Sequence, residues 1–185
     1  MTDALNQVQT DIKAAATPPD PDESERVGGP LLLADRSSIR AAAVQLADQA
    51  RRELLIVSRD LDPDLYDQRP FLDAVRRLAL ATPRTPVRVL VTEPRIPVSG
   101  GHRLIELTRR LSSRISIRRI GDDFRDQADS FLVADARGYC LHRVADRHTA
   151  RMELDAPREA RRLCATFEQI WEQSDGDSEL RRLYL

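Results

Sequence analysis

Apolar residues recur along residues 30–174 in two alternating patterns, one typical of strands and the other of helices. Continuous apolar runs at 54–57 and 87–91 indicate strands that are covered on both faces. Residues 115–118 alternate, which indicates a strand with one wetter side. Spacings of three and four residues predict three helices, which run from Ser37 or Ser38 to about Arg52, from Phe71 to Ala79 and from Leu104 to Leu111.

The pattern changes in the last third of the chain. Residues 131–134 and 139–142 flank Asp135-Ala136-Arg137-Gly138, which predicts an antiparallel hairpin with Gly138 in the tight turn. A short strand at 151–154 follows, and Asp155 is expected to cap a long helix with Pro157 in its first turn. We expect residues 31–33 to form a first strand or to lie along the body, and residues 179–184 to form a last helical turn.

This order predicts an α/β domain. Alternating strands and helices imply parallel strands with right-handed crossovers, and the hairpin adds antiparallel members to the same sheet. We therefore expect a mixed, mostly parallel sheet with helices on both faces and a C-terminal antiparallel hairpin. Residues 30–185 should form this single domain, while residues 1–29, acidic and rich in proline, should form a disordered tail.

Charge divides the chain in the same way. The net charge is −1, but residues 1–29 carry six acids against Lys13 and Arg26, and the remainder carries a small positive excess. Lys13 is the only lysine, so the basic residues are almost all arginine, which reflects either coding bias or phosphate recognition. A balance near zero argues against a dedicated nucleic-acid binder.

The remaining composition favours a soluble cytoplasmic protein without a cofactor. Cys140 and Cys164 fall in apolar patterns and are expected to be buried free thiols without metal-like spacing. Residues 1–185 contain neither an apolar run of membrane-spanning length nor a charged-then-apolar leader. His142, Asp146 and His148 lack the spacing of a metal site, and we expect no metal.

One segment is close to a known catalytic motif. Residues 128–135 read Ala-Asp-Ser-Phe-Leu-Val-Ala-Asp, and with the order of elements they resemble one half of the phospholipase D-like fold. In that family the pattern is His-x-Lys-x-x-x-x-Asp, with the histidine as nucleophile and the lysine as phosphate clamp. Ala128 and Ser130 replace these two residues and only Asp135 is kept. The resemblance therefore implies the fold without its chemistry, with Asp135 either inherited from a catalytic site or a turn residue that accepts backbone hydrogen bonds.

Three further segments carry a second resemblance. Residues 58–62, 101–107 and 170–174 are similar to an uncharacterised bacterial domain family that is often found C-terminal to GNAT-type acetyltransferases. The resemblance implies an acetyltransferase partner, which we expect to act in trans because the chain leaves no room for such a domain.

Ligands of open α/β sheets collect beyond the carboxyl ends of the strands, and polar segments should meet there. The candidate ligand-binding residues leave the first strong strand or open the third helix: Ser58, Arg59, Asp60, Gly100, Gly101, His102 and Arg103. Backbone amides at this helix start would favour an anion. Alternatively, the glycine pair is a flexible loop and Arg59 pairs with Asp60 or Glu93.

Arginines also concentrate around the third helix and the strand after it. The candidate nucleic-acid face consists of Arg109, Arg110, Arg114, Arg118 and Arg119. The alternative is a solvated face in which Glu106 pairs with neighbouring arginines. No aromatic residue interleaves with these arginines, so a stacking platform for bases is not expected.

The sequence thus favours a non-catalytic phospholipase D-like binding or regulatory module. We also expect a homodimer, because a single half of this architecture normally pairs with a second half. Two alternatives stay open. One is an enzyme that acts on a phosphorylated or anionic substrate through a relocated site at Ser58, Arg59, Asp60 and His102, and the other is a weak nucleic-acid binder.

Overall fold

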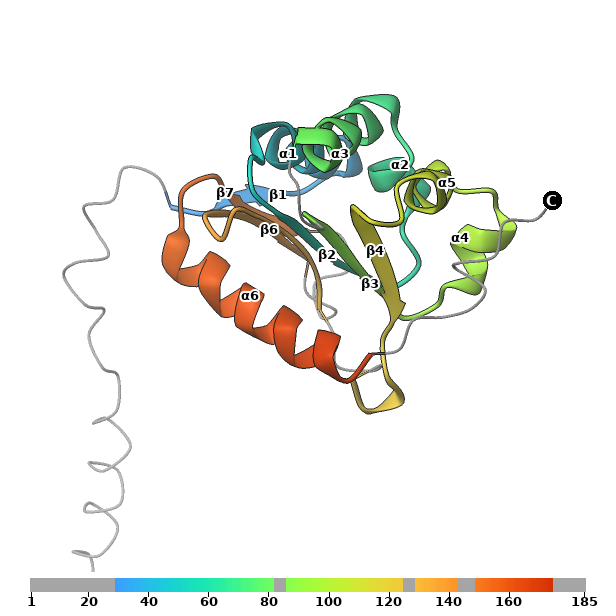
Figure 1. Ribbon diagram of the computed structural model, residues 1–185. Helices are drawn as coiled ribbons and strands as arrows, with labels where there is room; N and C mark the ends of the chain where they lie inside the picture. The colour runs from blue at the N-terminus through green and yellow to red at the C-terminus, as the bar shows by residue number, and fades with distance from the viewer. Residues whose placement is uncertain (1–28, 82–85, 125–128, 143–148, 175–185) are drawn as a thin grey trace, which may run out of the picture.

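A computed structural model describes residues 29–81, 86–124, 129–142 and 149–174. They form a seven-stranded sheet in the order β1-β7-β6-β5-β2-β3-β4, with helices on both faces (Figure 1). The strands are β1 (Leu31–Leu33), β2 (Leu54–Ser58), β3 (Val87–Val91), β4 (Ile115–Arg119), β5 (Ser130–Ala134), β6 (Gly138–His142) and β7 (Ala150–Glu153). The predicted strands are therefore all present.

Strand β2 joins two halves of this sheet. It pairs in parallel with β3, which pairs in parallel with β4, and it pairs antiparallel with β5 on its other side. The β5–β6 hairpin, β7 and β1 continue the antiparallel half. The expected α/β class, mixed sheet and hairpin are confirmed. The antiparallel share is larger than expected, because β1 and β7 pair beside the hairpin.

Two hydrophobic cores lie on the two faces of the sheet. The helices are α1 (Arg36–Gln49), α2 (Pro63–Tyr66), α3 (Arg69–Ala81), α4 (Arg95–Ser99), α5 (Arg103–Arg110) and α6 (Pro157–Glu172), with a 3₁₀ turn at Asp122–Phe124. Helices α1, α3 and α5 pack on one face and α6 on the other (Figure 1). All five residues of β2 are buried, so this strand belongs to both cores.

Helix α6 is held on its face of the sheet by an arginine from β3. The Arg88 guanidinium donates to both carboxylate oxygens of Glu168 at 2.8 and 2.6 Å and lies 5.2 Å from the Phe167 ring centre. Arg88 is only 21% exposed, so this bidentate pair contributes more than a surface ion pair would.

The predicted helix caps were wrong in two places. Asp35, not Ser37 or Ser38, is the N-cap of α1, because its carboxylate accepts from the Ser38 N–H at 2.9 Å. Ala156 precedes α6 with no side-chain hydrogen bond, while Asp155 pairs with Arg137 at 2.9 Å. At α1 the Asp35 carboxylate is a stronger acceptor than a serine hydroxyl. At α6 the Asp155 carboxylate is engaged by the Arg137 guanidinium instead of the helix N–H groups.

Gly138 does not supply the turn that the sequence suggested. Asp135 and Ala136 take the positive φ angles of 56° and 52°, and Gly138 is the first residue of β6. A Cβ at Gly138 would lie 2.8 Å from Leu46 Cδ2 and 3.0 Å from the Leu154 carbonyl oxygen. Glycine is thus needed here for close packing rather than for backbone conformation.

The expected tail at 1–29 and the helical turn at 179–184 fall outside the described residues, apart from Gly29. No helix within the described ranges has the length and apolar character needed to span a membrane. Cys140 is buried and Cys164 is half-buried, and both are free thiols.

Candidate functional site

The carboxyl end of β2 continues into a tight polar turn. Ser58 is buried, and its Oγ accepts a hydrogen bond from the Leu61 N–H at 3.1 Å. Leu61 is also buried and has a φ of 53°, a left-handed conformation that leucine rarely adopts. Such backbone strain is retained only where the surroundings enforce it, and it often accompanies a functional site.

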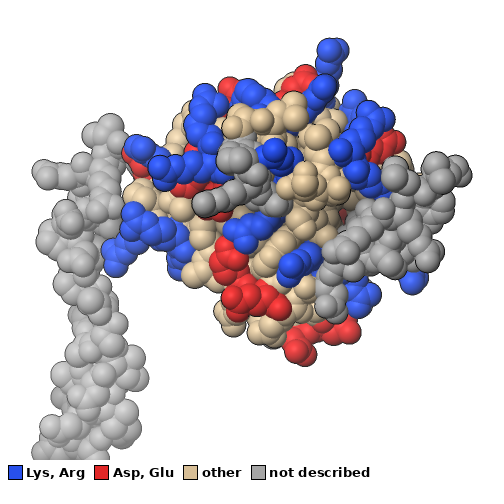
Figure 2. Space-filling view, in the orientation of Figure 1, with Lys and Arg blue, Asp and Glu red and all other residues tan. Residues whose placement is uncertain are grey.

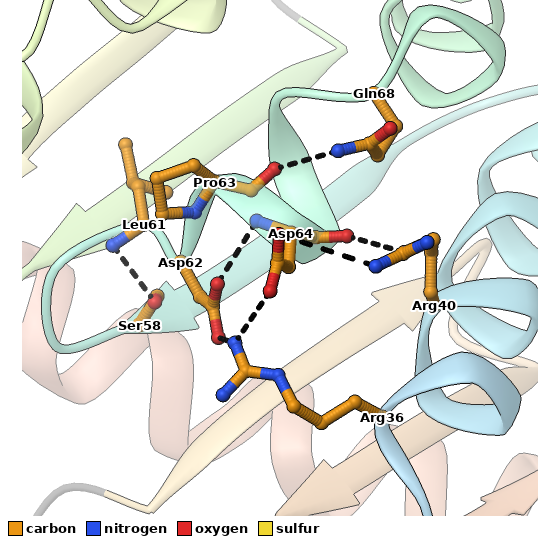
Figure 3. Close-up of polar contacts among 8 residues, drawn as sticks. All are labelled: Arg36, Arg40, Ser58, Leu61, Asp62, Pro63, Asp64 and Gln68. Atoms are coloured by element: carbon orange, nitrogen blue, oxygen red, sulfur yellow. Dashed lines mark hydrogen bonds and ion pairs between the residues drawn. The ribbon is translucent and has the colours of Figure 1, made fainter.

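A network of charges lies beside this turn (Figure 3). Arg36, at the start of α1, contacts Asp62 at 2.5 Å and Asp64 at 3.2 Å. Arg40 lies one turn further along α1, and its Nε donates to the Asp64 carbonyl at 2.8 Å. These groups are largely exposed, so each ion pair is worth at most about 1 kcal/mol. Together they fix the loop after β2 against α1.

The predicted anion cradle contains arginines that already have acidic partners. The Arg59 guanidinium donates to Glu93 Oε1 at 2.9 and 3.1 Å, which is one of the two pairings foreseen from the sequence. Arg103 Nε donates to Asp67 Oδ1 at 2.7 Å. Asp60 is half-buried near the turn. An anion at this edge would therefore have to compete with Glu93 and Asp67.

The two glycines of the predicted cradle shape the entry into α5. Gly100 ends α4 with its N–H donating to the Ile96 carbonyl, and Gly101 has a φ of 67°. The chain then reverses so that the His102 N–H bonds to the Pro97 carbonyl at 3.0 Å. The pair is an ordered connection between α4 and α5.

His102 is the most distinctive side chain of this edge. It is 3% exposed and is the N-cap of α5, where its Nδ1 accepts from the Leu104 N–H at 3.2 Å. The proton of the neutral ring is therefore assigned to Nε2, which is a buried atom. Desolvation lowers the pKa of His102, and the nearby Asp67 carboxylate opposes part of this shift.

The strand register brings a motif position to the same edge. Phe131 pairs with Val57, so Ser130, which precedes Phe131 in β5, lies next to Ser58 at the end of β2. Ser130 also pairs across the hairpin with His142. In the sequence, Ser58, Ser130 and His142 belong to three separate segments. The antiparallel pairing of β5 with β2 and β6 brings them to one end of the sheet. Ala128 lies outside the described residues, as do Asp146 and His148.

Asp135 lies at the opposite end of β5 and is fully engaged in the fold. Its carboxylate accepts backbone hydrogen bonds from Arg51, Arg52 and Glu53 at 2.9, 2.7 and 2.9 Å. Its own N–H donates to the Glu53 carbonyl at 3.1 Å. The structure thus has Asp135 as a turn residue that accepts backbone hydrogen bonds, and it ties the hairpin turn to the loop between α1 and β2.

The predicted arginine face is divided between the two faces of the sheet. Ile117 faces the core under α5, so Arg118 points to the α6 side, where it stacks 4.2 Å from the Trp171 ring centre. Arg118 also donates to the Trp171 carbonyl at 2.9 Å. Arg109 and Arg110 lie on α5 across the sheet. Arg114 immediately precedes β4, and Arg119 is the last residue of β4 and lies 3.7 Å from Asp122.

A concave feature that the sequence analysis missed lies on the α6 face. A pocket of about 300 Å³ is lined by Phe124, Asp129, Phe131, Arg162, Leu163, Thr166, Gln169 and Ile170. Its members come from three segments, so only the docking of α6 on β5 could have revealed it. In the described ranges, no group of three histidine, cysteine, aspartate or glutamate side chains could hold a metal ion.

Comparison with known proteins agrees with this architecture. A family model described as Domain of unknown function (DUF7931) matches residues 35–183. No curated protein matches the sequence.

Among solved structures, Nuc from Salmonella typhimurium, a phospholipase D family member, is similar with a TM-score of 0.55 and 14% identity, over 80% of this chain and 99% of that chain. NucT from Helicobacter pylori has a TM-score of 0.56 and 9% identity, again over 80% of this chain and 99% of that chain. TrmBL2, an archaeal chromatin protein, has a TM-score of 0.59 and 13% identity over 94% of this chain, which spans only 61% of TrmBL2. The fold is phospholipase D-like.

The three hydrogen bonds to Asp135 lead to a prediction about stability. Replacement by alanine (Asp135→Ala) leaves three amide groups without their acceptor and should lower the free energy of unfolding by roughly 2–4 kcal/mol. Asp135→Asn keeps one acceptor oxygen and tolerates a positive φ, so its loss should be smaller. Chemical denaturation measures both. The exposed Asp123 provides the control, since Asp123→Ala should change stability by less than about 0.5 kcal/mol. A similarly small change for Asp135→Ala would contradict the structural role.

The burial of His102 leads to a second prediction. Because its pKa is lower in the folded state, the unfolded chain binds the proton first, and stability should fall as the pH decreases below about 6.5. Protonation would also remove the Nδ1 acceptor from the α5 cap. The variant His102→Asn keeps a cap acceptor without titrating, so its stability should depend less on pH between about 6.5 and 5. Equal pH slopes in urea denaturation would contradict the prediction.

Proposed function

Since the chain belongs to the DUF7931 family and has a phospholipase D-like fold, we propose that it is a non-catalytic binding or regulatory module. The observation that carries the proposal is the use of Asp135, whose two carboxylate oxygens accept three backbone hydrogen bonds. The one acid kept from the motif thus supports the hairpin. Ala128 and Ser130 provide neither an imidazole nucleophile nor an ammonium group for phosphate.

The ligand would bind at the edge that contains Ser58, Ser130 and the start of α5. The turn after β2 is strained and tightly bonded, which preorganises its backbone. Arginines are present, but Arg59 and Arg103 are paired with Glu93 and Asp67. An anionic ligand would have to displace Glu93 from Arg59 or Asp67 from Arg103. We therefore expect weak binding that is sensitive to salt.

The enzyme alternative requires a different use of the same edge. Ser58 Oγ is an acceptor for the Leu61 N–H and His102 Nδ1 is an acceptor for the Leu104 N–H. A reaction through Ser58, Arg59, Asp60 and His102 would first have to release these contacts. For this reason we favour binding over catalysis.

A second candidate function is nucleic-acid binding. It is favoured by the likeness to TrmBL2, a chromatin protein described with a novel mode of DNA binding. In this chain Arg118 packs under Trp171, so only part of the Arg109–Arg119 set remains for such a contact. Arg110 and Arg119 are its exposed members.

Two partners complete the proposal. The module would act as a homodimer, since one chain holds one half of the phospholipase D-like architecture. This chain covers 99% of the length of the similar Nuc and NucT chains. It would also serve as an accessory subunit to an acetyltransferase in trans. This role is supported by the segments 58–62, 101–107 and 170–174, on which the sequence resemblance rests.

The central test is turnover of phosphodiesters by the full chain. A fluorescently labelled DNA or RNA oligonucleotide and bis(4-nitrophenyl) phosphate should stay uncleaved, because Ala128 and Ser130 supply neither the imidazole nucleophile nor the lysine of the motif. Gel analysis and absorbance measure the products. Robust cleavage that is lost in Ser130→Ala, a variant expected to fold normally at this half-exposed position, would refute a non-catalytic role.

The same oligonucleotide tests the second candidate function. Fluorescence anisotropy that rises at low salt, falls steeply with added salt and is reduced in Arg110→Glu with Arg119→Glu would support nucleic-acid binding. An unchanged anisotropy would exclude this face as a nucleic-acid surface.

Light scattering tests the dimer. At tens of micromolar protein we expect a mass twice that of the 20.9 kDa chain. A mass of one chain at that concentration would contradict the dimer while leaving the binding role intact.

A further inference from the structure

Exposed arginines gather at one end of the sheet, around the β5–β6 turn. They are Arg51, Arg52, Arg137, Arg158 and Arg161, and we call this surface the basic end. Figure 2 shows basic side chains on the left of the molecule, over the start of α6 and the neighbouring end of the sheet. This is the end opposite to Ser58 and Ser130, since Ala134 pairs with Leu54 at the start of β2.

Hydrogen bonds hold the three segments of the basic end together. The Asp135 carboxylate binds the backbone of Arg51 and Arg52, which fixes their loop against the turn. The Ala156 N–H donates to the Arg137 carbonyl at 2.8 Å, which places the start of α6 beside the same turn. Arg158 and Arg161 are both exposed and lie three residues apart in α6, on neighbouring positions of one helix face.

Three acidic side chains near the basic end already form ion pairs. Asp155 pairs with Arg137 at 2.9 Å, Glu159 with Arg162 at 2.6 Å and Asp48 with Arg77 at 2.8 Å. Within the described ranges, no ion pair joins Arg52, Arg158 or Arg161 to a carboxylate. The basic end therefore carries positive charge that the described part of the chain does not neutralise.

The N-terminal segment enters the fold at this same end. Leu31 pairs with Met152 and Tyr139 pairs with Glu153, so the first residue of β1 lies at the end of the sheet where β6 begins. Residues 1–28 precede it and contain six acids against two bases. Four of these acids lie together shortly before β1, at Asp20, Asp22, Glu23 and Glu25.

We propose that the acidic segment 20–25 docks on the basic end of its own chain. Only four to nine residues separate its acids from Gly29, a span of at most about 30 Å in extended chain. So short a tether gives an effective concentration in the millimolar range, at which weak ion pairs suffice for binding. The contact joins exposed charges, so added salt should screen the attraction and release the segment. The segment then occupies a surface that would otherwise attract a polyanion.

Paramagnetic relaxation enhancement tests this docking on the full chain. A nitroxide is attached at Ser24→Cys, with the half-buried Cys164 changed to alanine, while Cys140 is buried and should not react. At low salt the amides of residues 51, 52, 158 and 161 should broaden at least about threefold more than those of α3, and the difference should vanish at about 0.5 M salt.

Matched variants separate charge from other causes. Neutralising the acids (Asp20→Asn, Asp22→Asn, Glu23→Gln, Glu25→Gln) should abolish the broadening, and so should Arg158→Glu with Arg161→Glu. Arg76→Glu, at an exposed position of α3, is the control for removing an arginine outside the basic end. Asp3→Asn with Asp11→Asn is the control for removing acids outside the segment 20–25. Both controls should keep the broadening.

Three results would overturn the proposal. The first is no selective broadening at low salt. The second is broadening that persists when the four acids are neutralised, which would indicate an apolar contact. The third is equally strong broadening when a spin-labelled chain without ¹⁵N is mixed with a ¹⁵N chain without a nitroxide, because the occupant would then belong to a second copy.

Discussion

The architecture depends on the junction between β5 and the loop that leads into β2. Strand β2 is buried along its whole length and pairs in parallel on one side and antiparallel on the other, so its start must be held in register with both. The Asp135 carboxylate does this by binding three consecutive backbone amides. Hydrogen bonds to a carboxylate are strong, and without this carboxylate the three backbone N–H groups of the loop would lose their acceptor. The Asp135 carboxylate thus has a defined role in the fold.

Much of the fold could be predicted from short-range patterns. The apolar runs of β2 and β3 and the spacing of four and three residues between Ile39, Ala43 and Leu46 in α1 correspond to buried positions. Predictions that depended on competition between neighbours were wrong, as with Asp35 and Asp155. Spacing identifies which face of an element is apolar, but it does not show which of two adjacent polar side chains is better placed to accept a hydrogen bond.

The candidate site was harder to predict for a different reason. Ser58, Ser130 and His142 come from three strands, and their common location follows from long-range register that no local pattern encodes. The arginines near α5 showed the reverse. They are close in sequence, but strand alternation sends Arg118 to the face opposite α5, where an indole ring covers it. Proximity along the chain was therefore a poor guide to a shared surface.

The packing around Trp171 has a practical consequence. It is the only tryptophan in the chain, and its ring stacks on Phe167 at 5.4 Å and lies against the guanidinium groups of both Arg118 and Arg88. These neighbours belong to α6 itself and to the strands beneath it. The intrinsic emission of the indole therefore senses whether this helix is seated on the sheet, and it offers an optical reporter of that one interface without any added dye.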